Sequence, residues 1–567
     1  MKIILAFLAF LLISPHTQAQ QYKLPVNVPI SLSSNFAELR PNHLHSGVDI
    51  KMAAYPASRR EVVSTADGYI ARVYVNPYGF GKAIYIYHPA TKTTSVYGHL
   101  DCFSDEITKY VRAEQYRKKS FALNYYLKPT DIPVKAGDKI GVAGNSGMSG
   151  GIHLHYELRN SKEEPINLVK VGLITVMDNI PPAIVSVSVV EIDTCQGSYI
   201  FVNKGRFPAT KTANGIYKIP NAISINRPSY LTIEYVDRKN GVQNSFGIYS
   251  MCAKINGKRY FGFSLDNIDF KTTRYTNSLS EFYKNRASAY SVARLYVSEN
   301  NKLKIYDSVK ERGILNPASL PKNNDIVITL TDDSNNSSQV SLTLTTEKNT
   351  ATTRKYSFTA NSHVIKCDQA TLLKSPNAEL TIPVDAFYDN DIVDFYSLDG
   401  KSPYSKDIYL KGVYMPTQKG MTLKIKEDNL PENLRSKAIV ARVNSSGGRA
   451  SMGGKWEDGY VTAIINDNGK FMITTDTTAP YITSKQEKGT TIKGSKLRFT
   501  ISDNLSGIAT FNGYVDGKWE VFSLDGKSAL LEYEINNSDS TRRKHDVKID
   551  ITDAKGNKKI YQTYYYW

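Results

Sequence analysis

The chain has 567 residues, of which 41% are hydrophobic, and it carries a formal net charge of +17 at pH 7. This length predicts roughly three or four domains. A basic surface favours polyanions such as nucleic acid, anionic lipid or anionic cell-wall polymer, but the sequence holds no RNA- or DNA-binding motif, so we expect no nucleic-acid partner. The 38 tyrosines and the short apolar runs between polar segments favour β-rich domains over helical bundles.

The first residues have the pattern of a secretory signal peptide. Lys2 precedes the apolar run "IILAFLAFLLI", and the small residues Thr17 and Ala19 come just before a plausible cut at Gln20. The run is too short to span a membrane, and no later apolar segment approaches the ~20 residues that a spanning helix needs. We therefore expect residues 1–19 to be removed and the protein to be exported, periplasmic or secreted, with no transmembrane segment.

Residues 20–176 alternate short strand-like runs with glycine turns, which predicts a compact β domain. The pattern changes in residues 101–130, where Ser104 can cap a helix and Ile107 and Val111 follow at helical spacing. This segment is expected to be a helical insertion. Its basic residues either form a wall beside a substrate groove or stay solvated on the flank of the domain, and the sequence leaves both readings open.

Four landmarks recur in the same order in two later segments. "DNIPPAI" parallels "DTTAPYI", "YVDRKNG" parallels "ISDNLSG", "NGKRYFGFSLD" parallels "DGKWEVFSLD", and "LTDDSNN" parallels "ITDAKGN". We expect immunoglobulin-like β modules at 177–348, with insertions, and at 476–567. Residues 349–475 predict a β-rich middle domain that resembles neither copy. The predicted fold class is mainly β: a compact N-terminal barrel or sandwich with a helical insertion, then several immunoglobulin-like β-sandwich modules.

Four cysteines are spread over the predicted domains: Cys102, Cys195, Cys252 and Cys367. Export permits disulfides, but the spacing does not choose among the pairings. A Cys195–Cys252 disulfide would fall within one predicted domain. Four free thiols are equally compatible with the sequence.

The residues that carry chemistry gather in three short contexts, "NHLHSGVDI", "SVYGHL" and "GIHLHYELR". His153 and His155 share one face of an extended strand, and so do His45 and Asp49, because both offsets are even. His45, Asp49 and one of His153 and His155 make a catalytic zinc set, which uses three protein ligands. His99 and the remaining histidine would then flank the bound water as general base or oxyanion donors.

Each of these motifs taken singly is more often structural than functional. An HxH in a strand is commonly a surface or core feature, and a histidine among tyrosines commonly hydrogen-bonds in a core. Here, however, five of the nine histidines lie in three glycine-bearing contexts between Asn42 and Arg159. That concentration favours a site.

The region from Ser34 to Arg159 resembles the LytM/lysostaphin-type zinc metalloendopeptidases, which cut peptides of bacterial peptidoglycan. The resemblance rests on "HSGVDI", "VVSTADGYI", "YGFGKAIYIYH", "VYGHL" and "VKAGDKIGVAGNSGMSGGIHLHYELR". It implies a compact β domain of the duplicated hybrid motif type, with one Zn²⁺ per chain on the floor of a narrow groove. It also implies zinc-activated water attacking the scissile carbonyl, with two histidines assisting.

Carried over position by position, the resemblance implies that His45, Asp49 and His155 are the metal ligands and that His99 and His153 are the catalytic histidines. Arg40 is either a contact for a substrate carboxylate or a surface arginine. His43 falls outside the motif, and His88 is expected to be structural.

Three other readings remain open. The chain is a zinc peptidase that acts on proteins, or a catalytically inactive cell-wall binding or regulatory module, or a protein whose main role lies in its C-terminal β modules as an adhesin or scaffold. The leading expectation is an exported zinc endopeptidase that acts on peptidoglycan peptides. The sequence does not indicate what the β modules bind.

Overall fold

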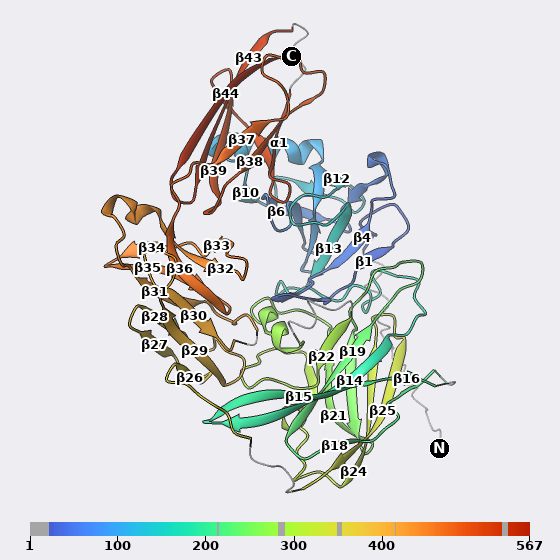
Figure 1. Cartoon of the computed structure of the whole chain (residues 1–567). Helices are drawn as coiled ribbons and strands as arrows, with labels where there is room; N and C mark the ends of the chain where they lie inside the picture. Colours follow the sequence, from blue (N-terminus) through green and yellow to red (C-terminus); the bar gives the residue numbers. More distant parts are fainter. Residues whose placement is uncertain (1–21, 213–214, 282–289, 349–353, 414, 536–541) are drawn as a thin grey trace, which may run out of the picture.

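The computed structural model describes residues 22–212, 215–281, 290–348, 354–413, 415–535 and 542–567. It is mainly β and consists of several separate sheets (Figure 1). The expected signal peptide, residues 1–19, lies outside the described residues. Within them, no helix is long and apolar enough to cross a membrane.

We name four units by the residues of their sheets and connections: the N-terminal unit (22–176), the first β module (183–346), the middle β module (362–475) and the C-terminal β module (481–567). These ranges describe the sheets, and the exact domain boundaries stay a prediction.

The N-terminal unit is built on an eight-stranded sheet in the order β1-β4-β13-β8-β7-β6-β10, with β11 also paired to β6. Its strands are β1 (Leu32–Ser34), β4 (Val48–Lys51), β6 (Gly68–Val75), β7 (Lys82–His88), β8 (Thr93–Gly98), β10 (Leu123–Tyr126), β11 (Pro133–Val134) and β13 (His153–Arg159). The smaller elements are the hairpin β2 (Leu39–Arg40) and β3 (His43–Leu44), and the sheet of β5 (Glu61–Val63), β12 (Lys139–Ala143) and β9 (Leu100–Phe103).

Both faces of the large sheet are covered, and they differ in what covers them. In β7, Ile84 and Ile86 join the main apolar core, whereas Ala83 and Tyr85 belong to a small separate cluster with Val96. This alternation follows from the two-residue period of a strand. Tyr85 also lines the groove described below, so the core holds one face of the sheet rigid while the other carries the site.

The insertion contains helix α1 (Asp105–Lys118), as expected, and it buries Ile107 and Val111. The helix contacts the C-terminal β module: Arg112 lies 3.2 Å from Glu534, and the Tyr116 hydroxyl donates to Glu520 over 2.5 Å. No residue of α1 lines the groove. The reading of the insertion as a basic groove wall is therefore wrong, and the helix packs on the flank against a distant part of the chain.

The first and C-terminal β modules repeat one pairing pattern. In the first, β14 (Ala183–Cys195) pairs with β19 (Ser229–Val236), and β24 (Asn323–Thr331) pairs with β20 (Ser250–Ile255) and β25 (Ser337–Thr346). In the last, β37 (Tyr481–Ser484) pairs with β38 (Lys496–Ser502), and β43 (Lys544–Asp553) pairs with β39 (Ile508–Val515) and β44 (Lys558–Tyr566). Apolar residues from both sheets of the C-terminal module form one core.

A hydrogen-bonded turn repeats with the strands. The Asn336 side chain donates to the backbone oxygen of Asp178 over 3.2 Å and to the carboxylate of Asp332 over 2.8 Å. Asn557 makes the same two contacts with Asp476 and Asp553, over 2.9 and 2.7 Å. The sequence repeat is thus also a structural repeat, while the immunoglobulin-like character of the modules stays a prediction.

The middle β module has a six-stranded and a five-stranded sheet that run from β26 (Ser362–Ile365) to β36 (Gly469–Thr475). All four cysteines of the chain are free. The Cys195–Cys252 disulfide is therefore not formed in this structure, and the alternative of free thiols describes it.

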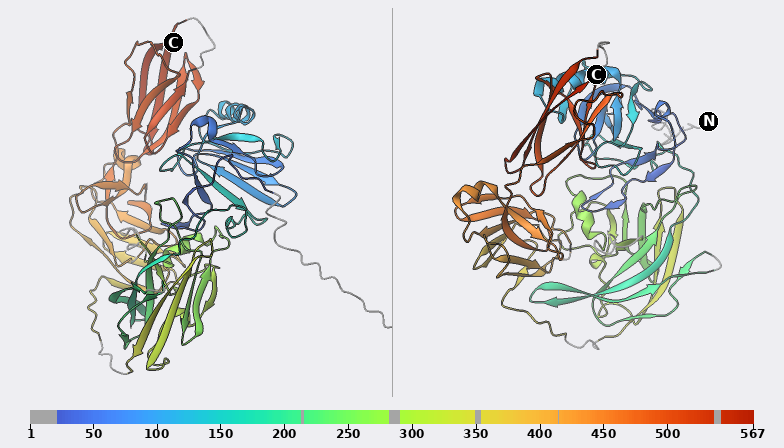
Figure 2. Two further views of the ribbon diagram at one scale, coloured as in Figure 1. Left: turned by 90° about the vertical axis from the view of Figure 1, so that its right-hand side faces the viewer. Right: turned by 45° about the horizontal axis from the view of Figure 1, so that its top comes forward.

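The four units close into a ring (Figures 1 and 2). Asn300 in the first β module donates to the backbone of Phe387 in the middle one over 2.9 Å, and Lys437 in the middle module donates to the backbone of Lys555 in the C-terminal one over 2.7 Å. The contacts of α1 complete the circle, and the N-terminal unit meets the first β module directly.

His88 gives the N-terminal unit a predictable response to acid. Its ring is buried between the Asp67 carbonyl and the Ser95 hydroxyl, and burial lowers its pKa. Above pH 6.5 both the folded and the unfolded forms are neutral. Below it the unfolded chain takes up the proton first, so stability falls as pH falls, by up to about 1.4 kcal/mol per pH unit.

We expect His88→Gln to remove this part of the acid sensitivity while adding a loss that does not depend on pH. Hydrogen exchange of the β7 amides, corrected for the intrinsic pH dependence, measures the change between about pH 7.5 and about pH 5. His363→Gln in the middle β module is the control. An equal change in the parent and in His88→Gln would contradict the prediction.

Candidate metal centre and its groove

Three neighbouring strands bring the sequence-predicted residues together. β4 pairs with β13 so that Asp49 lies opposite His155, and β13 pairs with β8 so that His155 lies opposite Gly98, next to His99. A side chain at Gly47 would come within 2.3 Å of the Tyr156 carbonyl. The glycine of "HSGVD" therefore permits the close approach that places His45 beside the two strands.

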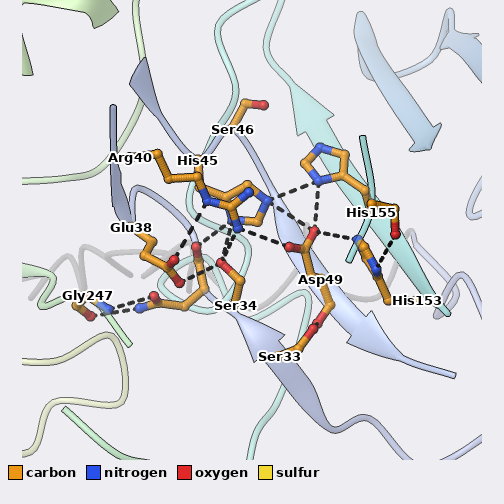
Figure 3. Close-up of polar contacts among 12 residues, drawn as sticks. Ser33, Ser34, Glu38, Arg40, His45, Ser46, Asp49, His153, His155 and Gly247 are labelled. Atoms are coloured by element: carbon orange, nitrogen blue, oxygen red, sulfur yellow. Dashed lines mark hydrogen bonds and ion pairs between the residues drawn. The ribbon is translucent and has the colours of Figure 1, made fainter. Parts of the chain in front are cut away.

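Three ligand atoms converge at one point. His45 Nε2 lies 3.1 Å from Asp49 Oδ1 and 3.0 Å from His155 Nδ1, and His155 Nδ1 lies 2.9 Å from Asp49 Oδ1 (Figure 3). All three residues are buried. Tetrahedral ligands at zinc bond lengths of about 2.0–2.1 Å are roughly 3.3 Å apart, so the arrangement is close to what a zinc ion requires.

The far ring nitrogens of both histidines are held by oxygen acceptors. His45 Nδ1 donates to the Asn35 carbonyl over 2.8 Å, and His155 Nε2 donates to Glu157 Oε1 over 2.9 Å. With those nitrogens engaged, His45 Nε2 and His155 Nδ1 are the ring nitrogens that face Asp49 Oδ1. A carboxylate or carbonyl behind each imidazole is the usual support of a metal ligand, and on this test the residues fit a metal ion.

Glu157 is a functional residue that the sequence reasoning missed. It is fully buried, and it accepts hydrogen bonds from Ser46 over 2.5 Å and from Arg159 over 2.7 Å as well as from His155. The signal was present, because Glu157 is two residues after His155 and shares its face of the strand. Asn35 was also missed, and no local pattern marks it.

The electrostatics of the cluster favour positive charge. Burial raises the pKa of Asp49, but the charge of His45 and the hydrogen bonds of His153 and His155 lower it well below its usual range. Burial likewise lowers the pKa of His155, but Asp49 and Glu157 raise it to about 9. Burial raises the pKa of Glu157, but His155 and Arg159 lower it to about 2. Two ionised carboxylates thus flank His155, which is the requirement for holding a cation.

The two predicted catalytic histidines lie beside the cluster. His153 Nδ1 donates to the Gly151 carbonyl over 2.9 Å, and its Nε2 lies 3.5 Å from Asp49 Oδ1. His99 Nδ1 donates to the Ser146 carbonyl over 2.8 Å, and the rings of His99 and His153 are 4.8 Å apart. His99 therefore keeps its Nε2 for a substrate or a water molecule, whereas Nε2 of His153 also faces Asp49.

His99 is strained and held neutral. Its backbone has φ of 60°, a left-handed conformation that non-glycine residues seldom adopt. Such strain persists where the surrounding structure fixes it, often at functional sites; here backbone hydrogen bonds to Phe80 and Gly144 do so. Burial and the nearby histidines lower the pKa of His99 to about 3, so the ring is neutral at pH 7 and Nε2 carries a lone pair.

Arg40 supports the second oxygen of the ligand carboxylate. Its guanidinium donates to Asp49 Oδ2 over 3.2 Å and to the Ser34 hydroxyl over 2.9 Å. The arginine is half-buried and also borders the groove, so it can both hold Asp49 and meet a substrate. His43 is exposed and hydrogen-bonds through Nδ1 to the Pro41 carbonyl; it borders the groove but is not one of the three converging residues.

The cluster lies in a groove of about 1180 Å³. Two units build its walls. The N-terminal unit contributes the basic residues Arg40, Lys51 and Arg72, and the first β module contributes Asn244, Phe270 and Thr273. The contribution of the first β module was not foreseen from the sequence.

Comparisons with known proteins give likenesses to peptidases and to one other domain. The zinc containing peptidase from Vibrio cholerae is 26% identical, over 25% of this chain and 37% of that chain, with a TM-score of 0.18. A variant catalytic domain of the prophage-encoded M23 protein EnpA from Enterococcus faecalis is 23% identical, over 25% of this chain and 90% of that chain, with a TM-score of 0.18. The antimicrobial peptidase lysostaphin from Staphylococcus simulans is 15% identical, over 38% and 96%, with a TM-score of 0.16.

This chain therefore spans little more than a third of the Vibrio cholerae chain, and the scores do not establish a common fold for all 567 residues. The Zu5-like domain family matches residues 362–476, in the middle β module. No curated protein matches the chain.

The predicted division between metal ligands and catalytic histidines can be tested by substitution. Asp49→Ala removes one of three converging ligand atoms, so we expect loss of both zinc and activity. His153→Ala removes a ring that is not among those atoms, so zinc content should stay near that of the parent while activity falls about 10²–10⁴-fold. Zinc analysis after dialysis, alongside hydrolysis rates, checks both variants. Equal zinc loss in the two would contradict the assignment.

Proposed function

We propose that the chain is an exported, zinc-dependent endopeptidase that hydrolyses stem peptides or peptide crosslinks of bacterial peptidoglycan. The observation that carries the proposal is the convergence of His45 Nε2, Asp49 Oδ1 and His155 Nδ1 within 3.1 Å of one another. The motif context of these residues and the signal-peptide pattern support the substrate class and the compartment.

The five residues of the site have different proposed roles. His45, Asp49 and His155 would hold one zinc ion, which when bound polarises a carbonyl and lowers the pKa of a water molecule. His99 Nε2, kept neutral by burial, takes a proton from the attacking water. His153 would donate from Nε2 to the oxygen of the scissile carbonyl as charge develops on it, which requires the imidazolium form because Nδ1–H is given to the Gly151 carbonyl.

The groove favours an acidic peptide. Arg40, Lys51 and Arg72 line it, and against them stands Glu38, whose pKa is raised by burial. Arg72 also stacks on Tyr85 at 4.6 Å. Stem peptides of the cell wall carry carboxylates, so a basic groove raises the local concentration of substrate.

We also infer that the first and C-terminal β modules are immunoglobulin-like copies of one module. The recurring strand pairs and the matching Asn336 and Asn557 contacts support this.

Digestion of purified peptidoglycan tests the function. We expect the parent protein to release peptides whose masses show the addition of one water per cut, and to stop when a chelator is added or when Asp49 is replaced by Ala. An unfolded protein substrate is assayed in parallel. Cleavage of the protein alone would favour the alternative of a protein peptidase, and cleavage of neither would favour an inactive binding module.

The groove and the insertion can be distinguished by their charges. Arg72→Gln should raise the KM for peptidoglycan fragments at low salt and matter less near 1 M salt, where the Debye length is ~3 Å. The triple replacement of Arg117, Lys118 and Lys119 by Gln should leave KM unchanged, because α1 lines no part of the groove. Steady-state kinetics at both salt concentrations measures this. A larger KM change in the triple variant would overturn the placement of the groove.

A further inference from the structure

The segment that carries the first metal ligand, residues 35–45, lies against the first β module. Its main chain and side chains are tied to that module at three points. The Asn35 side chain accepts from Gly247 N over 2.9 Å and donates to Gly247 O over 2.8 Å. Farther along the segment, Asn42 N donates to Asn277 and Leu44 N donates to Thr273, over 2.8 and 3.0 Å.

We call these hydrogen bonds between residues 35–45 and the first β module the clamp. Asn35 connects the clamp directly to the metal site. Its side chain faces the first β module, while its carbonyl accepts from His45 Nδ1 over 2.8 Å. The residue is 1% exposed, so no water competes for these bonds. Movement of Asn35 would therefore turn the His45 ring and displace Nε2 from the other two ligand atoms.

A chain of buried charges backs the clamp. Asn35 Nδ2 also donates to Asp333 Oδ2 over 3.2 Å, and the other oxygen of Asp333 lies 2.5 Å from Lys239 Nζ. Lys239 Nζ in turn donates to Asp178 over 2.9 Å, and these three charged side chains are at most 1% exposed. Buried ions tolerate little displacement once paired. The position of Asn35 is thus set by the interior of the first β module.

A second route reaches the other histidine ligand. Phe270 of the first β module lies under the Arg159 guanidinium, 4.8 Å from ring centroid to charge. Arg159 donates to Glu157, and Glu157 accepts from His155. Both histidine ligands are therefore supported from the same neighbouring module.

We propose that the first β module is a structural part of the metal centre and that Asn35 is the positioning residue through which it orients His45. The inference rests on the metal site of the proposed function and is independent of the substrate. It differs from a packing role, because packing alone would stabilise the interface without changing how tightly the metal is bound.

Metal affinity of the full chain tests this proposal without reference to hydrolysis. Asn35→Ala removes the side-chain bonds to Gly247 and Asp333 and keeps the carbonyl that accepts from His45. We expect zinc to bind about 10-fold or more weakly, which is the usual effect of losing a group that supports a metal ligand. Competition with a chelator of known affinity measures it. The visible spectrum of the Co²⁺-loaded variant should also differ from that of the parent, because the ligand geometry changes.

Asn267→Ala is the matched control. Asn267 lies at the same junction and donates to Glu164 over 3.4 Å, and among the described residues its side chain makes no hydrogen bond to residues 35–45. Its zinc affinity and Co²⁺ spectrum should equal those of the parent. If Asn35→Ala does not fold, the zinc affinity and Co²⁺ spectrum of Thr273→Val are measured instead. This substitution keeps the shape of the side chain and removes the acceptor of Leu44 N.

The outcomes are distinct. Parent-like affinity and spectrum in the folded Asn35→Ala protein, or an equal loss in Asn267→Ala, would overturn the proposal. Failure of the parent itself to bind zinc would instead overturn the proposed function.

Discussion

The site depends on the antiparallel pairing of β4 with β13, which sets Asp49 directly opposite His155. A shift of one residue would turn these side chains to opposite faces of the sheet. The register also brings His153 to the edge of the cluster and, through β8, brings His99 beside His153. Apolar residues on the opposite face of the same strands fix the register by burying their side chains in the core.

The buried carboxylates around this strand pair each have their own hydrogen-bond donors. Asp49 is held by Arg40 on its second oxygen, and Glu157 is held by Ser46 and Arg159. Carboxylates in such a setting stay ionised although buried, because each has a donor for the oxygen that does not face a histidine. Buried charges are also paired in the first β module, where Lys239 contacts two buried aspartates. In the C-terminal copy the sequence repeat places Leu505 at the position of Lys239, so only the first copy carries this buried ion network.

Much of the site was predictable because it is local. The even offset of His153 to His155 placed that pair on one face of β13, and the same rule would have found Glu157. It does not account for His45, which lies in the connection between β3 and β4 and not on the strand that carries Asp49. The helix in the insertion followed from the spacing of Ile107 and Val111; Ser104 precedes the helix as expected, but its side chain makes no capping hydrogen bond. The sequence did not predict the contacts between distant segments. These are the contacts of Asn35 with Gly247, Phe270 with Arg159, and α1 with Glu534. Neither strand periodicity nor helix capping specifies which surface a finished element meets.

The pairing of Asn35 with Asp333 spans 298 positions of the chain, and this separation has a consequence for the order of biogenesis. Synthesis from the N-terminus delivers the metal ligands early and the residues behind Asn35 much later. An unfinished chain, or one truncated before Asp333, has every ligand and catalytic histidine but lacks the last support for His45. Under the proposed function, acquisition of a firmly held metal would thereby be coupled to completion of the first β module, and hydrolytic competence would come late in the maturation of the protein.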